Sequence, residues 1–286
     1  MILDGKAVSA ALKADLAQKV KALPEKYGRV PHLVVILVGE DPASQVYVNN
    51  KSRAVEAVGF RSTTLLLPSD TAEDDLLGRI RELNADDGVD GILVQLPLPA
   101  QIDEAKVIRT IAVGKDVDGF HPLNVAALWQ RMPCIVPCTP KGIMKLLASA
   151  GIDPKGKRAV VVGRSNIVGL PVAKLLLDAH ATVTVCHSRT ADLAEETRRA
   201  EILVVAAGRP RMITGEMVSE GAVVIDVGVN RDKEGKLCGD VDFDTVAPKA
   251  SFITPVPGGV GPMTIACLME NTLECFLNRL RGQSPE

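Results

Sequence analysis

Short apolar runs alternate along this chain with longer segments in which apolar residues recur at helical spacing. The apolar runs predict strands at 33–38, 63–67, 91–96, 160–162, 182–185, 202–206 and 223–227. The periodic segments predict helices at about 43–58, 71–84 and 168–177, and a final helix from 263 to about 280. Strands that are apolar on both faces are typical of parallel sheets covered by helices on both sides. The pattern therefore predicts an α/β protein.

Residues at the expected helix ends refine this picture. Asp41 and Pro42 predict the start of one helix, as N-cap and first-turn proline, and Thr71 predicts a cap for the next helix. Residues 113–140 are rich in Gly, Asp and Pro and are expected to be a section rich in loops. A connecting helix through Ala150 follows.

With 286 residues the chain is long enough for two domains with separate cores. The order of elements predicts two α/β domains flanking a cleft, the second a Rossmann-type dinucleotide-binding domain. We place the first domain at residues 1–138 and the second at 139–262. The helical segment in 263–286 is expected to pack back on the first domain, because a terminal helix needs an apolar partner. Ligands of such sheets bind beyond the carboxyl ends of the strands.

Residues 159–190 have the layout of a dinucleotide-binding unit: apolar strand, glycine turn, helix and second apolar strand. Gly163 and Gly169 would let the backbone approach a pyrophosphate at the start of the helix, where free N–H groups and the helix dipole attract anions. The turn reads G-R-S-N-I-V-G rather than G-x-G-x-x-G, so the glycines alone are a weak signal.

The end of the second strand indicates which coenzyme is bound. NAD-binding units place Asp or Glu there for the ribose 2′-hydroxyl, whereas this chain has Cys186-His-Ser-Arg-Thr190. The segment lacks such an acid, and four residues near it suit a 2′-phosphate: Arg164, Ser165, Ser188 and Arg189. NADP is therefore favoured over NAD.

The charge balance argues against two classes of partner. A net charge of −2 and a pI near 6.1 leave no electrostatic footprint for nucleic acid or an anionic membrane. The sequence shows no signal peptide and no apolar run of the roughly 18 residues that a membrane span needs. We therefore expect a cytoplasmic protein.

The six cysteines are most simply buried small hydrophobic residues in a reducing compartment. Cys134 and Cys138, together with Cys186 and His187, lack the spacing of a zinc site. The acidic run 240–244 lacks the glycine and the final acid of a calcium loop, and we interpret it as a loop held by structural hydrogen bonds. No metal site is expected.

The helix expected at 43–58 carries a candidate for proton transfer. Tyr47 and Lys51 share one helical stripe with Ala54 and Val58. An ammonium group partly removed from water gives up a proton more readily, which is the usual route to a lysine acid or base. From spacing alone, however, a lysine that reaches water from the edge of the core is favoured, and Tyr47 can be an ordinary core aromatic.

Loop positions supply further candidates, each with a structural alternative. Gln95 interrupts an apolar strand near its carboxyl end, so it either faces the cleft or bonds to neighbouring backbone. Of Asp116 and Asp118 in an extended loop, one is expected to face the cleft and accept N–H groups of a heterocycle, unless it only caps a turn. The glycines of Pro257-Gly-Gly-Val-Gly-Pro262 imply close approach to a flat group, or plain loop geometry. Val229 follows an apolar strand and would lie beside a nicotinamide.

Eight motifs cover nearly the whole chain in a fixed order. They are Tyr47-Val-Asn-Asn-Lys51, Asp90-Gly-Ile-Leu-Val-Gln-Leu-Pro-Leu-Pro99, Lys115-Asp-Val-Asp-Gly-Phe120, Pro137-Cys-Thr-Pro-Lys-Gly142, Val162-Gly-Arg-Ser-Asn-Ile-Val-Gly169, Cys186-His-Ser-Arg-Thr190, Gly239-Asp-Val-Asp242 and Phe252-Ile-Thr-Pro-Val-Pro-Gly-Gly-Val-Gly-Pro262. With these motifs in this order, the chain resembles the bifunctional methylenetetrahydrofolate dehydrogenase/methenyltetrahydrofolate cyclohydrolase family.

The resemblance implies two reactions. 5,10-Methylenetetrahydrofolate would give a hydride to NADP⁺, and water would then open the methenyl product to 10-formyltetrahydrofolate. Lys51 would transfer protons in the second step, with Gln95 bonded to it. Tyr47 would orient the folate and Asp118 would grip the pterin.

The same resemblance implies further contacts and an assembly. The folate would also meet Pro257, Gly258 and Gly259. The family's cofactor contacts match Gly163, Arg164, Ser165 and Val229, and Ser188 with Arg189 matches its NADP class. A homodimer is implied as well.

From the residues alone two other functions stay open. One is a monofunctional NADP dehydrogenase of another small substrate, with Lys51 as its proton donor. Absence of NADPH formation with methylenetetrahydrofolate would favour it. The other is a non-catalytic NADP-binding regulator, which would bind NADP without turnover of either folate.

Overall fold

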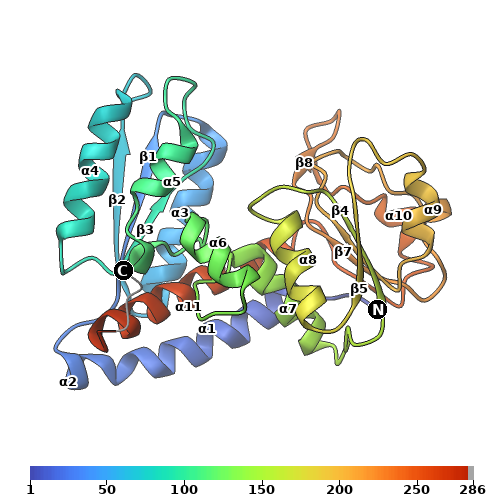
Figure 1. Ribbon diagram of the computed structural model, residues 1–286, viewed down its shortest axis with the longest axis horizontal. Coiled ribbons are helices and arrows are strands. Elements are labelled where there is room, and N and C mark those ends of the chain that lie inside the picture. Colours follow the sequence, from blue (N-terminus) through green and yellow to red (C-terminus); the bar gives the residue numbers. More distant parts are fainter. Residues whose placement is uncertain (283–286) are drawn as a thin grey trace. The chain divides into compact units, whose positions relative to one another are not determined.

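The structure of the protein, a computed structural model, describes residues 1–282, except for six side chains in helix α3: Pro42, Ala43, Ser44, Val46, Tyr47 and Asn49. Contacts within the chain divide it into two units. The three-stranded unit contains residues 11–138 and the chain from 268 onward. The five-stranded unit contains residues 1–10 and 139–267. Both units are drawn in Figure 1.

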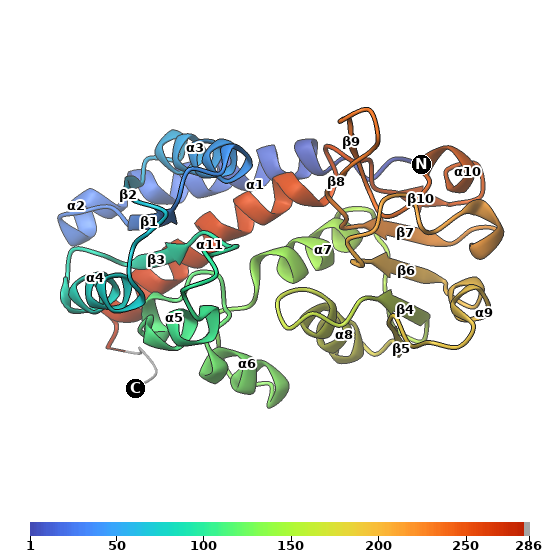
Figure 2. The same ribbon diagram turned by 90° about the horizontal axis from the view of Figure 1, so that it is seen from above.

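The three-stranded unit is built on a parallel sheet in which β1 (His32–Val38) lies between β2 (Arg61–Leu67) and β3 (Gly91–Val94). Helix α3 (Pro42–Ala57) packs on one face, and α4 (Glu73–Ala85) and α5 (Glu104–Thr110) lie on the other (Figure 2). The unit also contains most of α1 (Gly5–Lys21), α2 (Leu23–Tyr27), η1 (Val113–Lys115), α6 (Pro122–Trp129) and the end of α11 (Val260–Leu280).

One edge strand of this sheet, β2, differs from the other two, β1 and β3, which are buried throughout. β1 is buried over its whole length, as its apolar run predicts, because helices cover both of its faces. On one face Val34 and Ile36 pack with Leu76 and Ile80 of α4. β2 is an edge strand in which exposed residues alternate with half-buried ones, and Leu66 is 70% exposed. The core of the unit therefore lies around β1, while β2 presents an open edge.

The five-stranded unit is built on a second parallel sheet, with strand order β10-β7-β6-β4-β5. Its strands are β4 (Arg158–Val162), β5 (Thr182–Cys186), β6 (Ile202–Val205), β7 (Val223–Asp226) and β10 (Phe252–Ile253). The chain moves from β4 to one neighbour, β5, and then crosses to the other side at β6. In such sheets ligands bind at the carboxyl ends of the strands where the order reverses, here beside β4 and β6.

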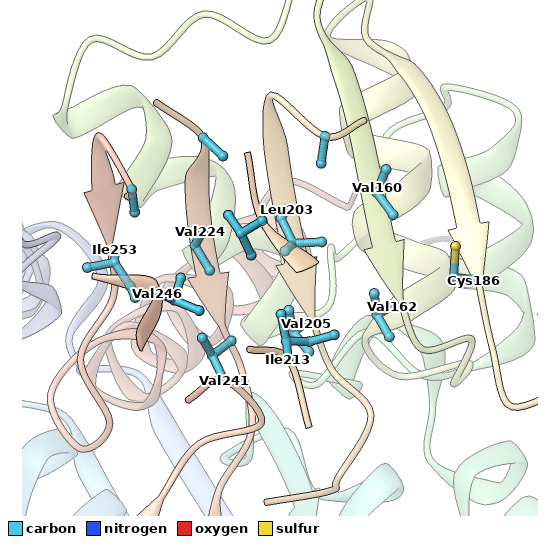
Figure 3. Packing of buried hydrophobic residues seen from close by; sticks show 14 residues of the cluster. Val160, Val162, Cys186, Leu203, Val205, Ile213, Val224, Val241, Val246 and Ile253 are labelled. Carbon is cyan, nitrogen blue, oxygen red and sulfur yellow. The ribbon is translucent and has the colours of Figure 1, made fainter. Parts of the chain in front are cut away.

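Helices cover this sheet on both sides. They are α7 (Cys138–Ser149), α8 (Gly169–Asp178), α9 (Leu193–Arg198), η2 (Gly215–Met217) and α10 (Phe243–Val246), and a small hairpin pairs β8 (Asn230–Arg231) with β9 (Leu237–Cys238). Figure 3 shows the core on one face, where side chains of neighbouring strands stand in rows: Val160, Val162, Leu203, Val205, Val224 and Ile253. The α/β class and the parallel sheets predicted from the apolar runs are confirmed.

The first ten residues belong with the second half of the chain. The Leu3 N–H donates to the Ile253 carbonyl at 2.8 Å, and the Ile253 N–H donates to the Met1 carbonyl at 3.0 Å. These bonds continue the sheet beyond β10. The residue pattern of the first ten positions does not predict this pairing, because it joins segments about 250 residues apart.

Some local predictions are wrong. The loop-rich section 113–140 also contains η1, α6 and the start of α7, which were not predicted. Thr71 does not cap α4: its hydroxyl donates to the Pro68 carbonyl, and α4 begins at Glu73 without a side-chain cap.

The last helix begins at Val260, three residues before the expected start, because Pro262 in a first turn does not interrupt a helix. Positions 283–286 of the segment predicted to pack back lie outside the described residues. Within residues 1–282, no helix combines the length and the apolarity that a membrane crossing requires.

Candidate active site and cofactor-binding turn

A hydrogen bond joins two of the sequence-predicted residues at the carboxyl end of β3. Gln95 follows that strand, and its N–H donates to the Ile36 carbonyl of β1 at 2.9 Å. The side-chain amide of Gln95 donates to the Leu96 carbonyl at 2.7 Å, which turns Oε1 toward Lys51. The Lys51 ammonium donates to this oxygen at 2.9 Å. A lysine that merely reaches water would not need this acceptor.

The orientation of α3 agrees with the predicted stripe. Val55 and Val58 are buried, Lys51 is half-buried, and Arg53 and Glu56 are exposed. Lys51 therefore stands on the side of the helix that faces the sheet. The backbone of Tyr47 lies in the same helix, but its predicted side-chain role lies outside the described residues.

The neighbouring carboxylates Asp116 and Asp118 have different surroundings. Asp116 is buried and accepts hydrogen bonds from the N–H groups of Gly119 (3.1 Å) and His121 (2.8 Å) and from the side chain of Asn124 (2.8 Å). It organises the loop. Asp118 is only partly buried and accepts a long hydrogen bond of 3.9 Å from the Cys138 thiol. Within the described residues, backbone N–H groups thus bond to Asp116, whereas the Asp118 carboxylate accepts only this side-chain thiol.

Burial raises the pKa of Asp118 from 3.8 to about 6. The positive charge of Lys51 opposes this rise, and the negative charge of Asp116 adds to it. A narrow pocket lies against the two aspartates, and its other lining side chains are apolar, among them Ile92, Val94, Leu96, Ile108 and Phe120. A carboxylate with apolar neighbours can accept N–H groups at the edge of a heterocycle.

Two residues that the sequence did not assign to the site hold the Asp118 loop. Asn271 of α11 is fully buried, and its amide donates to the carbonyls of Val117 and Val136 at 2.9 Å each. The Cys138 thiol donates to the Val117 carbonyl at 3.3 Å. In the sequence, Asn271 is visible only as an amide within an otherwise apolar helical segment. This pattern does not reveal that its partner lies 154 positions away.

The glycine turn after β4 packs closely against backbone atoms of the turn itself and of the segment that follows β6. Gly163 has φ +120°, and a Cβ there would lie 2.1 Å from the carbonyl oxygen of Ala206. A Cβ on Gly169 would lie 2.2 Å from the carbonyl oxygen of Gly163. Both positions therefore require glycine before any ligand is considered.

Ser165 caps helix α8 from within this turn. Its hydroxyl accepts the N–H groups of Val168 (3.2 Å) and Gly169 (3.3 Å), and its carbonyl accepts the N–H of Leu170 (3.0 Å). Pro171 has no N–H. The expectation of free amides at this helix start is wrong for these residues, and the helix dipole remains as the attraction for an anion.

The turn lies beside the end of β5. The Gly163 N–H donates to the Cys186 carbonyl at 2.9 Å. Arg164 comes directly after Gly163, and Ser188 and Arg189 lie two and three positions after Cys186. All three side chains are exposed. The structure thus brings together the two basic segments that a 2′-phosphate requires, with no acidic residue among positions 187–190.

The remaining predicted residues lie in the five-stranded unit. Val229 follows β7 and is 54% exposed. Gly258 has φ +112° and accepts the Lys6 N–H at 3.1 Å, and a Cβ on Gly259 would lie 2.6 Å from Thr254. Local packing thus already accounts for both glycines, while Pro257 beside them is exposed.

Comparison with known proteins identifies two family domains in the sequence. Residues 3–118 match the domain described as tetrahydrofolate dehydrogenase/cyclohydrolase, catalytic domain. Residues 137–280 match the one described as tetrahydrofolate dehydrogenase/cyclohydrolase, NAD(P)-binding domain.

Similar proteins extend over the full length. The chain is 62% identical to the bifunctional protein FolD of Acidiphilium cryptum, over 95% of this chain and 96% of that protein. The crystal structure of the bifunctional FolD methylenetetrahydrofolate dehydrogenase/cyclohydrolase of Campylobacter jejuni superposes with a TM-score of 0.95, at 51% identity and over 98% and 99% of the two chains. The Trypanosoma brucei enzyme, crystallised with NADP cofactor and inhibitor, gives 0.94 at 43% identity over 98% of each chain.

Proposed function

Because this chain belongs to the tetrahydrofolate dehydrogenase/cyclohydrolase family, we propose that Lys51, Gln95 and Asp118 carry the chemistry of its two reactions. The enzyme oxidises 5,10-methylenetetrahydrofolate to 5,10-methenyltetrahydrofolate with NADP⁺ and then hydrolyses the product to 10-formyltetrahydrofolate. The observation that supports these residues most directly is the 2.9 Å hydrogen bond from Lys51 to Gln95.

Lys51 acts in the hydrolytic step. Water adds to the methenyl carbon and loses one proton. The bond between this carbon and N5 then breaks as N5 takes up a proton, and the remaining hydroxyl group loses its proton to become the formyl carbonyl, so that one proton is released overall. These transfers need a group that can hold a proton close to that carbon. The hydrogen bond to Gln95 fixes the direction of the Lys51 amine, and Gln95 is itself held by the Leu96 carbonyl. Gln95 is therefore a positioning residue for Lys51.

Asp118 binds the pterin. Its carboxylate has two oxygens that can accept the amino and ring N–H groups along one edge of the heterocycle. Tyr47 from the same helix as Lys51, and Pro257, Gly258 and Gly259, complete the folate contacts in this proposal by their match to the family.

The coenzyme binds at the carboxyl end of the second sheet. NADP⁺ supplies the hydride acceptor. Gly163 lets the backbone come close to it, and Ser165 keeps the turn and the start of α8 together. Arg164, Ser188 and Arg189 bind the 2′-phosphate, and Val229 offers an exposed apolar side chain to the nicotinamide.

The two units divide this work. The three-stranded unit, residues 11–138 with the chain from 268 onward, binds the folate and performs proton transfer. The five-stranded unit, residues 139–267 with the first ten residues, binds NADP.

The protein also forms a homodimer and works in the cytoplasm. The open edge of β2 with its exposed Leu66 supports association with a second copy, and the absence of a disulfide among the described cysteines suits a reducing compartment. Light scattering tests the assembly: Leu66→Lys should give a monomer, whereas Leu123→Lys, at an exposed leucine of α6, should not change the mass. An unchanged dimer in the first variant would remove β2 from the interface.

A coupled spectroscopic assay tests the function, because it follows methenyltetrahydrofolate as it forms and disappears with NADP⁺. Lys51→Met should slow its hydrolysis by about 10²- to 10⁴-fold, the usual contribution of general acid–base catalysis. NADP binding should stay within about two-fold of the parent value. Arg53→Met, at an exposed position of the same helix, is the matched control. Unchanged hydrolysis in the Lys51 variant would exclude this residue as the proton-transfer group.

A further inference from the structure

A buried carboxylate in the five-stranded unit collects four hydrogen bonds from two separate loops. Asp240 is fully buried. Its Oδ2 accepts the N–H groups of Ala207 (2.6 Å) and Gly208 (2.9 Å). Its Oδ1 accepts the N–H of Arg209 (2.8 Å) and the side-chain amide of Asn230 (2.8 Å). Three successive backbone amides thus close around one side chain, as they would around a bound anion.

A second carboxylate sets the position of the first. Asp226, at the end of β7, accepts the N–H of Asp240 at 2.9 Å and that of Val241 at 3.0 Å. The contact leaves no room for side chains: a Cβ on Gly239 would lie 1.7 Å from an Asp226 oxygen, and a Cβ on Gly228 would lie 2.4 Å from an Asp240 oxygen. The two aspartates therefore form one closely packed arrangement with these glycines.

This arrangement is costly to the fold. Burial raises the pKa of Asp226 from 3.8 to about 6, so its ionised form lowers the stability of the folded state at neutral pH. Residues that reduce stability in this way are concentrated at functional sites.

The loops that Asp240 holds lie at the carboxyl ends of β6 and β7, and β6 borders the point where the sheet order reverses. Residues 206–209 follow β6, and residues 227–230 follow β7 and include the exposed Val229. The Ala206 carbonyl lies against Gly163 of the cofactor-binding turn. In a sheet of this topology the adenosine half of a dinucleotide lies toward β5, and the other half extends over β6 and β7.

We propose that Asp240 is a positioning residue for the nicotinamide half of NADP, holding the loops after β6 and β7 in the form that receives it. The proposal rests on the cofactor site assigned above. It assigns to the acidic run 240–244 a role beyond holding its own loop together.

The geometry calls for a carboxylate rather than an amide of the same shape. Each oxygen of Asp240 accepts two donors. In Asp240→Asn one oxygen becomes an NH₂ group, which would face two donors and could accept neither. One of the two loops must then shift.

Direct binding measurements with two probes test the proposal. In Asp240→Asn the Kd of NADP⁺ should rise at least ten-fold, whereas the Kd of adenosine 2′,5′-bisphosphate, which lacks the nicotinamide half, should stay within two-fold. Hydrolysis of methenyltetrahydrofolate, which needs no coenzyme, should also stay within two-fold and shows that the protein is folded. Asp244→Asn, the same change at an exposed position, is the control and should alter none of these values.

The following outcomes decide the matter. An unchanged Kd for NADP⁺ in folded Asp240→Asn overturns the proposal, and so does an equal loss for both probes. If that variant does not fold, Asn230→Ala removes only one of the four donors, and a three-fold or greater rise in the Kd of NADP⁺ supports the proposal, whereas no rise overturns it. Failure of the unchanged protein to bind either probe would instead refute the cofactor site itself.

Discussion

The two sheets of this protein begin with the same topology and use it differently. In both, the second strand lies on one side of the first and the third on the other, as β2-β1-β3 and as β5-β4-β6. At the carboxyl end of the smaller sheet the functional groups that we propose are side chains: Lys51, Gln95 and Asp118. At the larger sheet a closely packed backbone turn and exposed side chains form the proposed coenzyme surface, and buried side chains such as Asp240 bond only to the chain itself. Proton transfer needs titratable side chains, whereas coenzyme binding needs a surface whose shape fits the coenzyme.

This contrast predicts that substitutions in the two sheets separate the two reactions. The largest separation is expected at Gly163. In Gly163→Ala the new Cβ would collide with the Ala206 carbonyl, and NADP⁺ binding should weaken by about 100-fold or more, since the turn must move. Titration with NADP⁺ and the rate of methenyltetrahydrofolate hydrolysis are the measurements.

The control for this change is Gly156→Ala. Gly156 has φ +75°, so alanine costs similar backbone strain, but nothing lies within 4 Å of the new Cβ. NADP⁺ binding should not change. If hydrolysis fell as much as NADP⁺ binding in Gly163→Ala, the two sheets would not be functionally separable.

Asp118→Asn should act on folate and leave the coenzyme alone. An amide cannot accept two N–H groups, so the KM for methenyltetrahydrofolate should rise about ten-fold. In the parent protein the same KM should rise as the pH falls below about 6, because Asp118 becomes protonated there. A pH-independent KM between 5 and 7.5 would argue against an ionised Asp118 in binding.

The same variant should be more stable than the parent at neutral pH. The folded-state pKa of Asp118 lies above its unfolded value, so the ionised form opposes folding, and this cost grows as the pH rises from about 4 to 6. Removing the charge should add at most about 3 kcal/mol at pH 8 and nothing near pH 4. Denaturant unfolding at the two pH values measures the difference.

The arginines near β5 should affect the choice of coenzyme. Arg189→Ala and Arg164→Ala should weaken NADP⁺ by about ten-fold each and NAD⁺ much less, because only NADP⁺ carries the 2′-phosphate that they bind. Kd values for both coenzymes provide the check. Equal losses would mean that neither arginine contacts the 2′-phosphate.

Ser165→Ala should have the smallest effect. It removes the acceptor for two amides at the start of α8, and the loss of a helix cap costs about 1 kcal/mol. Thermal unfolding should show this loss, with NADP⁺ binding weakened only a few-fold. A full loss of binding would mean that the hydroxyl contacts the coenzyme directly.

Much of the fold follows from local pattern. The buried strands β1, β4, β6 and β7 were predictable because each is a continuous apolar run between turns, and their covered faces require that composition. Lys51 and Gln95 were identifiable as polar interruptions of apolar faces. The helix in residues 122–129 was not, because it is short and begins at a proline within a segment rich in turn residues.

Composition and periodicity determined the class of fold, the glycine turn and the basic residues beside it, because these depend on neighbours in the chain. Tertiary structure alone decided that Asp116 organises its loop while Asp118 stays accessible, that Asn271 holds that loop from a distant helix, and that Asp240 gathers two loops around one carboxylate. Such contacts join segments far apart in the chain. Their partners are chosen by which elements pack together, and no local pattern records that choice.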